Sequence, residues 1–116
     1  MSEAHFIIPP LTVGSFLLHS RLLVGTGKYA SAEQMNACLA ASGTDCVTVA
    51  IRRIKLDGKP EENLLNHLDR KRYTVLPNTA GCFSADDAVR CARLSRELLN
   101  TPLVKLEVLA DTRTLL

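Results

Sequence analysis

Residues 46–51, with the sequence CVTVAI, are almost entirely apolar and largely β-branched. A strand that does not alternate between apolar and polar positions is typical of a parallel sheet covered on both faces. Just before it, a helical pattern begins at Ser31, where Gln34 completes a capping box, and ends at Gly43. Such a strand beside a helix predicts an α/β fold, with a parallel sheet and helices outside it.

The rest of the chain continues this alternation. The sequence predicts a β-hairpin around Gly14-Ser15 (11–18) and strands over 21–24, 46–51, 73–76 and 101–111. Between these strands it predicts an amphipathic helix over 61–68 and a helix capped by Ser84, in addition to the helix that begins at Ser31. The strand over 73–76 is expected to end at Pro77-Asn78. The predicted order is therefore a hairpin followed by βαβαβαβ.

Four strands are half of what a closed (β/α)₈ barrel needs. Such a barrel takes about 250 residues, and this chain has 116. The first and fourth strands would each present an open edge, which soluble proteins usually cover. We therefore predict an α/β fold of the (β/α)₈ TIM barrel family. Residues 1–116 would be the N-terminal half of a single, incomplete barrel domain, with about the first four β-strands and an N-terminal β-hairpin.

Composition excludes several classes of function. The formal net charge of +2 is too small to indicate nucleic acid or an anionic membrane, and aromatic residues make up only 4% of the chain. No apolar run reaches the ~20 residues of a membrane span. No His, Cys or carboxylate spacing indicates a metal, and no cofactor is expected. The four cysteines lack C-x-x-C spacing, which favours reduced thiols in a cytoplasmic protein.

The strand over 101–111, TPLVKLEVLAD, carries Lys105 and Glu107 among apolar residues. Successive side chains of a strand point to opposite faces, so this pair shares one face while Val104, Leu106 and Val108 share the other. If helices cover the apolar face, the charged face points into the barrel. Burial would lower the pKa of Lys105 and give a neutral amine able to form a Schiff base, with Glu107 moving protons. A structural Lys–Glu ion pair is the alternative.

Polar residues also follow the other strands. The sequence GTGKYA at 25–30 satisfies G-x-G-x-x-A of the dinucleotide fingerprint, but Arg52 and Arg53 stand where that fingerprint needs an acidic residue. Arginines would suit a 2′-phosphate, so an NADP-binding or other ligand-binding half-domain remains an alternative. A tight turn that needs glycine is another. Because ligands bind at the carboxyl ends of parallel strands, the candidate substrate-binding residues are Gly25, Thr26, Arg52, Asn78 and Thr79.

Four segments in order, RLLVGTGKY, VTVAIRR, LPNTAGC and VKLEVL, resemble the thiazole synthases of thiamine biosynthesis. The resemblance extends from about Leu11 to the end of the chain. It implies a (β/α)₈ barrel, a homo-oligomer, and a transferase that builds the thiazole phosphate. The implied substrates are 1-deoxy-D-xylulose 5-phosphate, iminoacetate (dehydroglycine) and sulfur from the thiocarboxylate of a sulfur carrier protein. An iminoacetate-producing enzyme is the implied further partner.

The resemblance also assigns roles to two residues. The Schiff-base lysine of the family matches Lys105, and the glutamate two positions later matches Glu107 as the candidate acid or base. Members of the family are about twice as long as this chain, and their phosphate-binding loops and a second acidic residue lie in the half absent here. This chain alone is therefore expected to bind substrate poorly. A class I aldolase-like Schiff-base enzyme acting on another phosphosugar is the remaining alternative.

Overall fold

The computed structural model describes residues 8–116, which form two β-sheets and two α-helices. The strands are β1 (Leu11–Val13), β2 (Phe16–Leu18), β3 (Leu23–Gly25), β4 (Cys46–Ala50) and β5 (Thr74–Asn78). The helices are α1 (Ala32–Ser42) and α2 (Ala85–Leu99), with short 3-10 helices over Ile51–Arg53, Pro60–Glu62 and Leu64–His67. The expected α/β class is confirmed.

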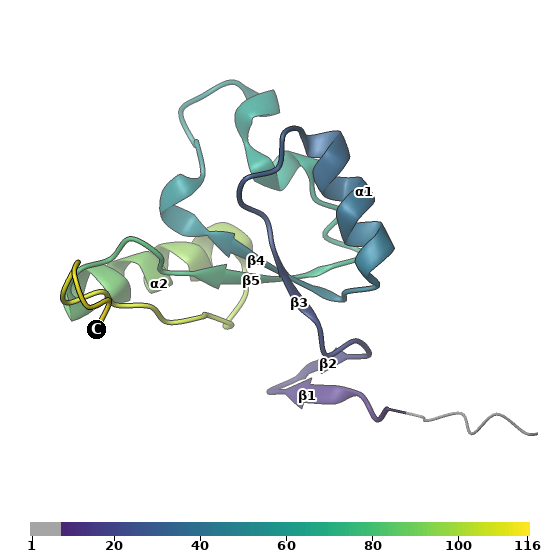
Figure 1. Ribbon diagram of the computed structural model, residues 1–116, viewed down its shortest axis with the longest axis horizontal. Coiled ribbons are helices and arrows are strands. Elements are labelled where there is room, and N and C mark those ends of the chain that lie inside the picture. Colours follow the sequence, from purple (N-terminus) through teal and green to yellow (C-terminus); the bar gives the residue numbers. More distant parts are fainter. Residues whose placement is uncertain (1–7) are drawn as a thin grey trace, which may run out of the picture.

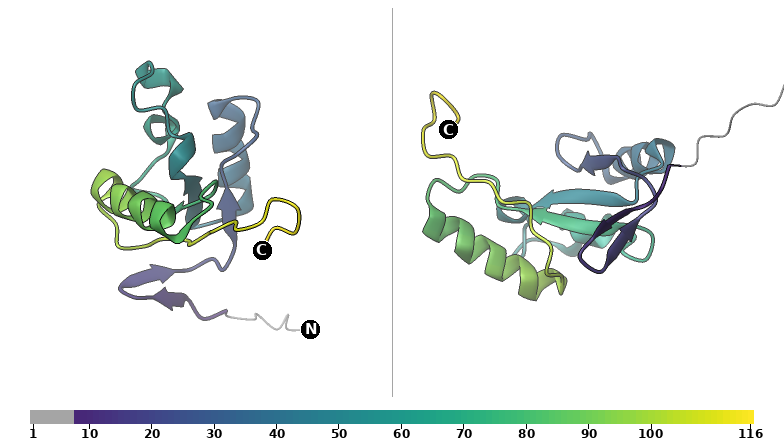
Figure 2. Two further views of the ribbon diagram at one scale, coloured as in Figure 1. Left: turned by 90° about the vertical axis from the view of Figure 1, so that its left-hand side faces the viewer. Right: turned by 90° about the horizontal axis from the view of Figure 1, so that it is seen from below.

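The two sheets differ in direction. β1 and β2 form the expected antiparallel hairpin, which lies below the other strands in Figure 1 and in the left view of Figure 2. β3, β4 and β5 form a parallel sheet in that order, with the strands drawn between α1 and α2 in Figure 1. At the hairpin turn Gly14 has φ +58°, a backbone conformation that glycine adopts without steric cost.

The two α-helices begin where the sequence predicts. Ser31 Oγ accepts a hydrogen bond from Gln34 N at 3.0 Å, and Ser84 Oγ accepts one from Asp87 N at 3.2 Å. Gln34 Oε1 in turn accepts from Ala30 N at 2.8 Å, one residue before the expected position of a capping box. These bonds satisfy amide groups that an α-helix leaves unpaired at its first turn.

β4 is the buried centre of the parallel sheet, as its sequence predicts. Val47 and Val49 point to one face of β4 and Cys46 points to the other. All three are nearly inaccessible to solvent, so both faces of the strand are buried. The hydrophobic core that surrounds this strand contains Met35, Leu39, Val47, Val49, Ile51, Leu68, Tyr73, Val75 and Leu99. The core therefore joins α1, the parallel sheet and the end of α2.

The helix expected over 61–68 was wrong. Two 3-10 helices occupy this range, and Asn63 lies between them. Asn63 Oδ1 accepts a hydrogen bond from Leu65 N at 3.0 Å, so its side chain starts a new turn instead of continuing the previous one. The apolar spacing of the segment is compatible with either kind of helix.

The expectation that the third strand ends at Pro77-Asn78 was also wrong, because β5 continues through both residues. Pro77 has no N–H to donate, which normally excludes it from a central strand. Its carbonyl oxygen accepts a hydrogen bond from Lys105 N at 2.8 Å. The N–H and C=O of one strand residue point the same way, so the missing donor faces residues 103–109 and leaves the pairing with β4 intact.

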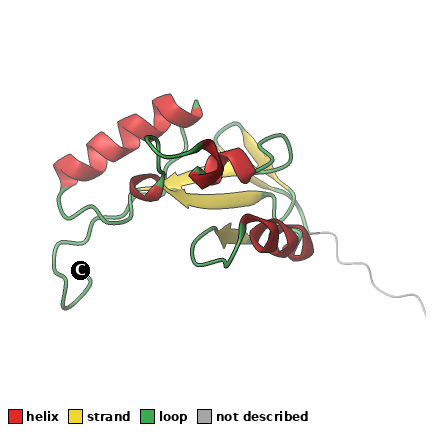
Figure 3. Cartoon of the chain, turned by 90° about the horizontal axis from the view of Figure 1, so that it is seen from above, coloured by secondary structure: helices red, strands yellow, loops and turns green. Residues whose placement is uncertain are grey.

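Residues 101–111 do not form the fourth strand that the sequence predicts. The segment runs beside β5, but its only strand-like pairing is a single parallel bridge between Asn78 and Lys105. Figure 3 accordingly draws the chain after α2 as a loop. Its apolar face is only partly covered within residues 8–116, since Val104 is 39% exposed and Leu106 is 67% exposed. One bridge is too short a pairing to make a strand.

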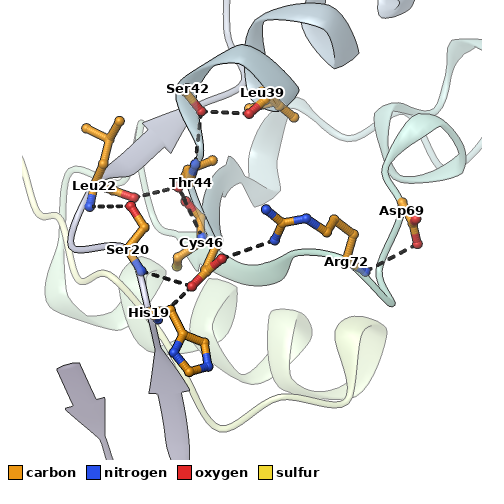
Figure 4. A network of polar contacts seen from close by, with 10 residues as sticks. His19, Ser20, Leu22, Leu39, Ser42, Thr44, Cys46, Asp69 and Arg72 are labelled. Carbon is orange, nitrogen blue, oxygen red and sulfur yellow. Dashed lines mark hydrogen bonds and ion pairs between the residues drawn. The ribbon is translucent and has the colours of Figure 1, made fainter. Parts of the chain in front are cut away.

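A carboxylate joins the hairpin to the amino end of the parallel sheet. Asp45 Oδ2 accepts hydrogen bonds from His19 N at 2.6 Å and Ser20 N at 2.9 Å, and its Oδ1 accepts one from Arg72 Nη1 at 3.1 Å (Figure 4). The bond from Ser20 is the largest cause that lowers the pKa of Asp45 below its ordinary value. Burial opposes this shift, and Arg72 and His19 reinforce it.

We expect Asp45→Asn to lower the free energy of unfolding by about 2 kcal/mol near neutral pH, since charge-assisted hydrogen bonds are lost. Because the pKa of Asp45 is lowered on folding, its contribution is present above the unfolded-state value of about 3.9 and is lost as the pH falls through the folded value. Urea unfolding at pH 7 and pH 3 measures this. A difference between the two proteins that stayed constant across this range would contradict the assignment.

Candidate functional site

The carboxyl ends of β3, β4 and β5 meet at a cleft of about 350 Å³. Gly25 and Thr26 line it from the end of β3, Asn78 and Ala80 line it from the end of β5, and Glu107 reaches it from the segment beside β5. Parallel strands bring the loops that follow them to one edge of the sheet, where ligands bind in this class of fold. The cleft is therefore the candidate functional site.

Two of the predicted substrate-binding residues form a polar frame for this cleft with β4. Thr26 Oγ1 donates a hydrogen bond to Thr48 O at 2.9 Å, and Asn78 Nδ2 donates one to Thr48 Oγ1 at 2.7 Å. Asn78 Oδ1 also accepts a bond from Ala80 N at 3.2 Å. The structure thus brings Gly25, Thr26 and Asn78 together, and it fixes Asn78 through both ends of its amide.

Thr79 is placed differently from the prediction. Its side chain is fully buried and does not line the cleft. Thr79 Oγ1 donates to Glu107 O and accepts from Glu107 N, both at 2.7 Å, and Thr79 N donates to Lys105 O at 3.3 Å. Thr79 therefore holds the backbone of the segment that carries the two charged residues, which is a positioning role.

Lys105 and Glu107 do share one face, as the alternation predicts. Lys105 Nζ lies 2.8 Å from Glu107 Oε1, and the carboxylate side chain lines the cleft. The expected burial of this pair was wrong for the chain as described, since the side chains are 52% and 41% exposed. The reason is that the described residues around this segment leave one side of the pair open to solvent.

Arg52 was predicted to line the site, but Arg53 does so instead. Arg52 lies against Gly81 in the loop after β5, where a Cβ built on that glycine would be 3.5 Å from Arg52 Cδ. The two arginines belong to a 3-10 helix, in which neighbouring side chains point about 120° apart. The sequence places both at the end of β4 and contains no signal that separates them.

Lys28 is a further residue of the cleft that the sequence did not single out. It lines the site from the loop after β3 and has φ +68°. This left-handed conformation is uncommon for residues other than glycine, asparagine and aspartate. The prediction assigned the turn of GTGKYA to its glycines and named Gly25 as a site residue, although the residue with the positive φ is the lysine.

Other kinds of site receive no support from the described part of the chain. Within residues 8–116, no group of His, Cys, Asp and Glu side chains has the arrangement of a metal site. No helix among them is long and apolar enough to cross a membrane. All four cysteines are free thiols; Cys82 Sγ and Cys91 Sγ lie 3.4 Å apart, and burial is the first cause that raises the pKa of Cys91.

Comparison with known proteins gives one consistent family. Residues 12–116 match the family described as thiazole biosynthesis protein ThiG. A thiazole synthase of Rhodopirellula baltica is 56% identical over 113 residues, which cover 92% of this chain and 39% of the relative. Thiazole synthases of Geobacter metallireducens and Stutzerimonas stutzeri are 57% and 56% identical, over 83% and 91% of this chain and 37% and 41% of their own lengths.

The chain belongs to the ThiG family of thiazole biosynthesis proteins. It spans about two fifths of the length of the curated relatives that it matches. The resemblance drawn from the four sequence segments is confirmed, and it takes precedence over the dinucleotide-binding and aldolase-like alternatives.

Proposed function

We propose that this chain supplies the imine-forming lysine and the proton-transferring carboxylate of a thiazole synthase. The observation that carries the proposal is the contact of 2.8 Å between Lys105 Nζ and Glu107 Oε1 beside a cleft at the carboxyl ends of parallel strands. Relatives named thiazole synthase, with more than half of the aligned positions identical, give the reaction class.

In the proposed reaction, the Lys105 amine attacks the ketone of 1-deoxy-D-xylulose 5-phosphate and water leaves as the imine forms. Glu107 lies within hydrogen-bonding distance of the amine and moves protons on the imine, so that the carbonyl group shifts along the sugar. Sulfur then arrives from the thiocarboxylate of the carrier protein, whose carboxyl group takes the displaced carbonyl oxygen and leaves as a carboxylate, and condensation with iminoacetate closes the ring with loss of water. Thr79 supports imine formation and proton transfer, because its bonds to the backbone of Glu107 hold this segment in place.

The finer architecture is part of the same proposal. The three parallel strands and the segment beside β5 are the beginning of a (β/α)₈ barrel, and residues 1–116 form the N-terminal part of that single domain. Support comes from the exposed apolar side chains of Val104, Leu106 and Val108, which a barrel helix would cover, and from the greater length of the relatives. A closed barrel would also bury Lys105. A cytoplasmic homo-oligomer is the proposed assembly.

The proposal is tested by trapping the imine in the protein as its own cells make it. Borohydride reduces an imine to a stable secondary amine, so incubation with 1-deoxy-D-xylulose 5-phosphate and borohydride should add one sugar phosphate per site. Peptide mass mapping should place the adduct on Lys105. Omitting borohydride is the control, and an adduct on another lysine would overturn the assignment.

A further inference from the structure

Two cations of the cleft are not used by the proposed reaction. We infer that Lys28 and Arg53 form the subsite for the carboxylate of the glycine-derived imine, iminoacetate, that is condensed with the sugar. This inference rests on the proposed function and adds the position of its second small substrate. Both residues line the same cleft as Glu107, although they come from different loops.

The loop of residues 25–28 lies against Arg53 at the cleft. Arg53 lies close to the backbone of Gly27, where an added Cβ would be 3.6 Å from Arg53 Nη1. Lys28 follows Gly27 directly. Arg53 therefore lies beside the residue that precedes Lys28.

The charge of the cleft favours an anion. Among residues 8–116, the described ion pairs are Lys55–Glu62, Arg72–Asp45, Arg90–Asp87 and Lys105–Glu107. Neither Lys28 nor Arg53 belongs to one of them, and Glu107, the acidic residue that lines the cleft, is held by Lys105. Two cations that line one concave site and belong to none of these ion pairs attract a negatively charged ligand.

The backbone of Lys28 separates this interpretation from an ordinary solvated surface charge. With φ +68° the residue occupies a conformation that glycine adopts more readily than any L-residue with a Cβ. A loop selected only for its turn would be served better by glycine at this position. A lysine there indicates that its side chain has a use, and it lines this cleft as well as an adjoining hollow that Glu61 and Glu62 also line.

The position of the subsite indicates which anion it binds. In barrels of this type, phosphate groups are usually held by the loops after the seventh and eighth strands, whereas Lys28 and Arg53 follow β3 and β4. A planar carboxylate matches the fork of an arginine, and a lysine adds a second donor. A monoanion is also repelled less by nearby Glu107 than a phosphate dianion would be. The carboxylate held here would present its imine carbon toward the sugar on Lys105.

The test measures the KM for each of the three substrates separately. It uses Lys28→Gln, Arg53→Gln and Arg53→Lys variants of the protein as its cells make it. Iminoacetate is formed in the assay from glyoxylate and ammonia. We expect the KM for iminoacetate to rise at least about tenfold in both glutamine variants, the loss of one charge-assisted hydrogen bond. The Arg53→Lys variant should show a smaller rise in this KM than Arg53→Gln. Borohydride trapping of the sugar phosphate should stay at the wild-type yield.

The control variants are Lys55→Gln and Arg90→Gln, which remove exposed cations that do not line the cleft. Both should keep the wild-type KM values, and thermal unfolding of every variant shows whether it is folded. A raised KM for the sugar phosphate with weaker trapping would assign the cations to phosphate and overturn the inference. A raised KM for the carrier thiocarboxylate alone would overturn it in favour of the carrier. Unchanged KM values would reject any anion subsite, whereas a wild-type protein that forms no imine would reject the proposed function instead.

Discussion

Lys105→Ala should abolish imine formation with 1-deoxy-D-xylulose 5-phosphate and lower turnover by at least about 10³-fold, because the attacking amine is removed. Lys105→Arg should be equally inactive. A guanidinium keeps the positive charge beside Glu107 but does not lose its proton in proteins, so it cannot attack a ketone. The measurement is single-turnover trapping with borohydride, read by mass.

The fold should survive both changes. The ion pair between Lys105 and Glu107 is about half exposed, and such pairs contribute less than about 1 kcal/mol to stability. Lys105 is held in place mainly by its backbone, through bonds to Pro77 O and Thr79 N. Lys59→Ala, an exposed lysine of the loop after β4, is the matched control and should trap normally. An arginine variant that still gave the adduct would remove Lys105 from the mechanism.

Local features of the fold were predictable from the sequence because the residues that create them are neighbours. Ser31 and Ser84 each bond an amide three residues later, and the hairpin turn needs only Gly14 and Ser15. β4 was predictable for a different reason: a strand buried on both faces contains apolar residues at nearly every position. These features depend on residues that are close together or of one kind.

The errors in the fold came from long-range contacts and from polar side chains that compete with the backbone. Asn63 divides a segment whose apolar spacing alone indicates one helix. Residues 101–111 have the composition of a strand, but within the described chain they make one bridge to β5 and not a ladder. A sequence pattern predicts which residues can pair, whereas the pairing itself depends on contacts with residues far away in the chain.

In the site, the sequence predicted the neighbourhood better than the individual contacts. Gly25, Thr26 and Asn78 line the cleft as expected, because each lies at or just after the carboxyl end of a parallel strand. Thr79 differs from Asn78 only by the alternation of side chains, which turns it toward the backbone of Glu107. Arg52 and Arg53 are separated by the turn of a 3-10 helix that no sequence pattern indicated.

Glu107→Gln should separate the two steps of the proposed reaction. The variant should still form the imine on Lys105, because the amine is untouched. Turnover should fall by about 10²–10⁴-fold, the usual loss when a positioned acid or base is removed. The amide has nearly the shape of the carboxylate, and Thr79 holds residue 107 by its backbone, so the side chain should stay at the cleft.

The measurement pairs borohydride trapping with the exchange of sugar carbon-bound hydrogen for deuterium in heavy water. Exchange requires a base, so it should fall with turnover in Glu107→Gln while the trapped adduct persists. Glu62→Gln is the control, since Glu62 pairs with Lys55 in the loop after β4 and does not line the cleft. If exchange continued at the wild-type rate in Glu107→Gln, a group other than Glu107 would carry the proton, and the 2.8 Å contact with Lys105 would be a structural ion pair.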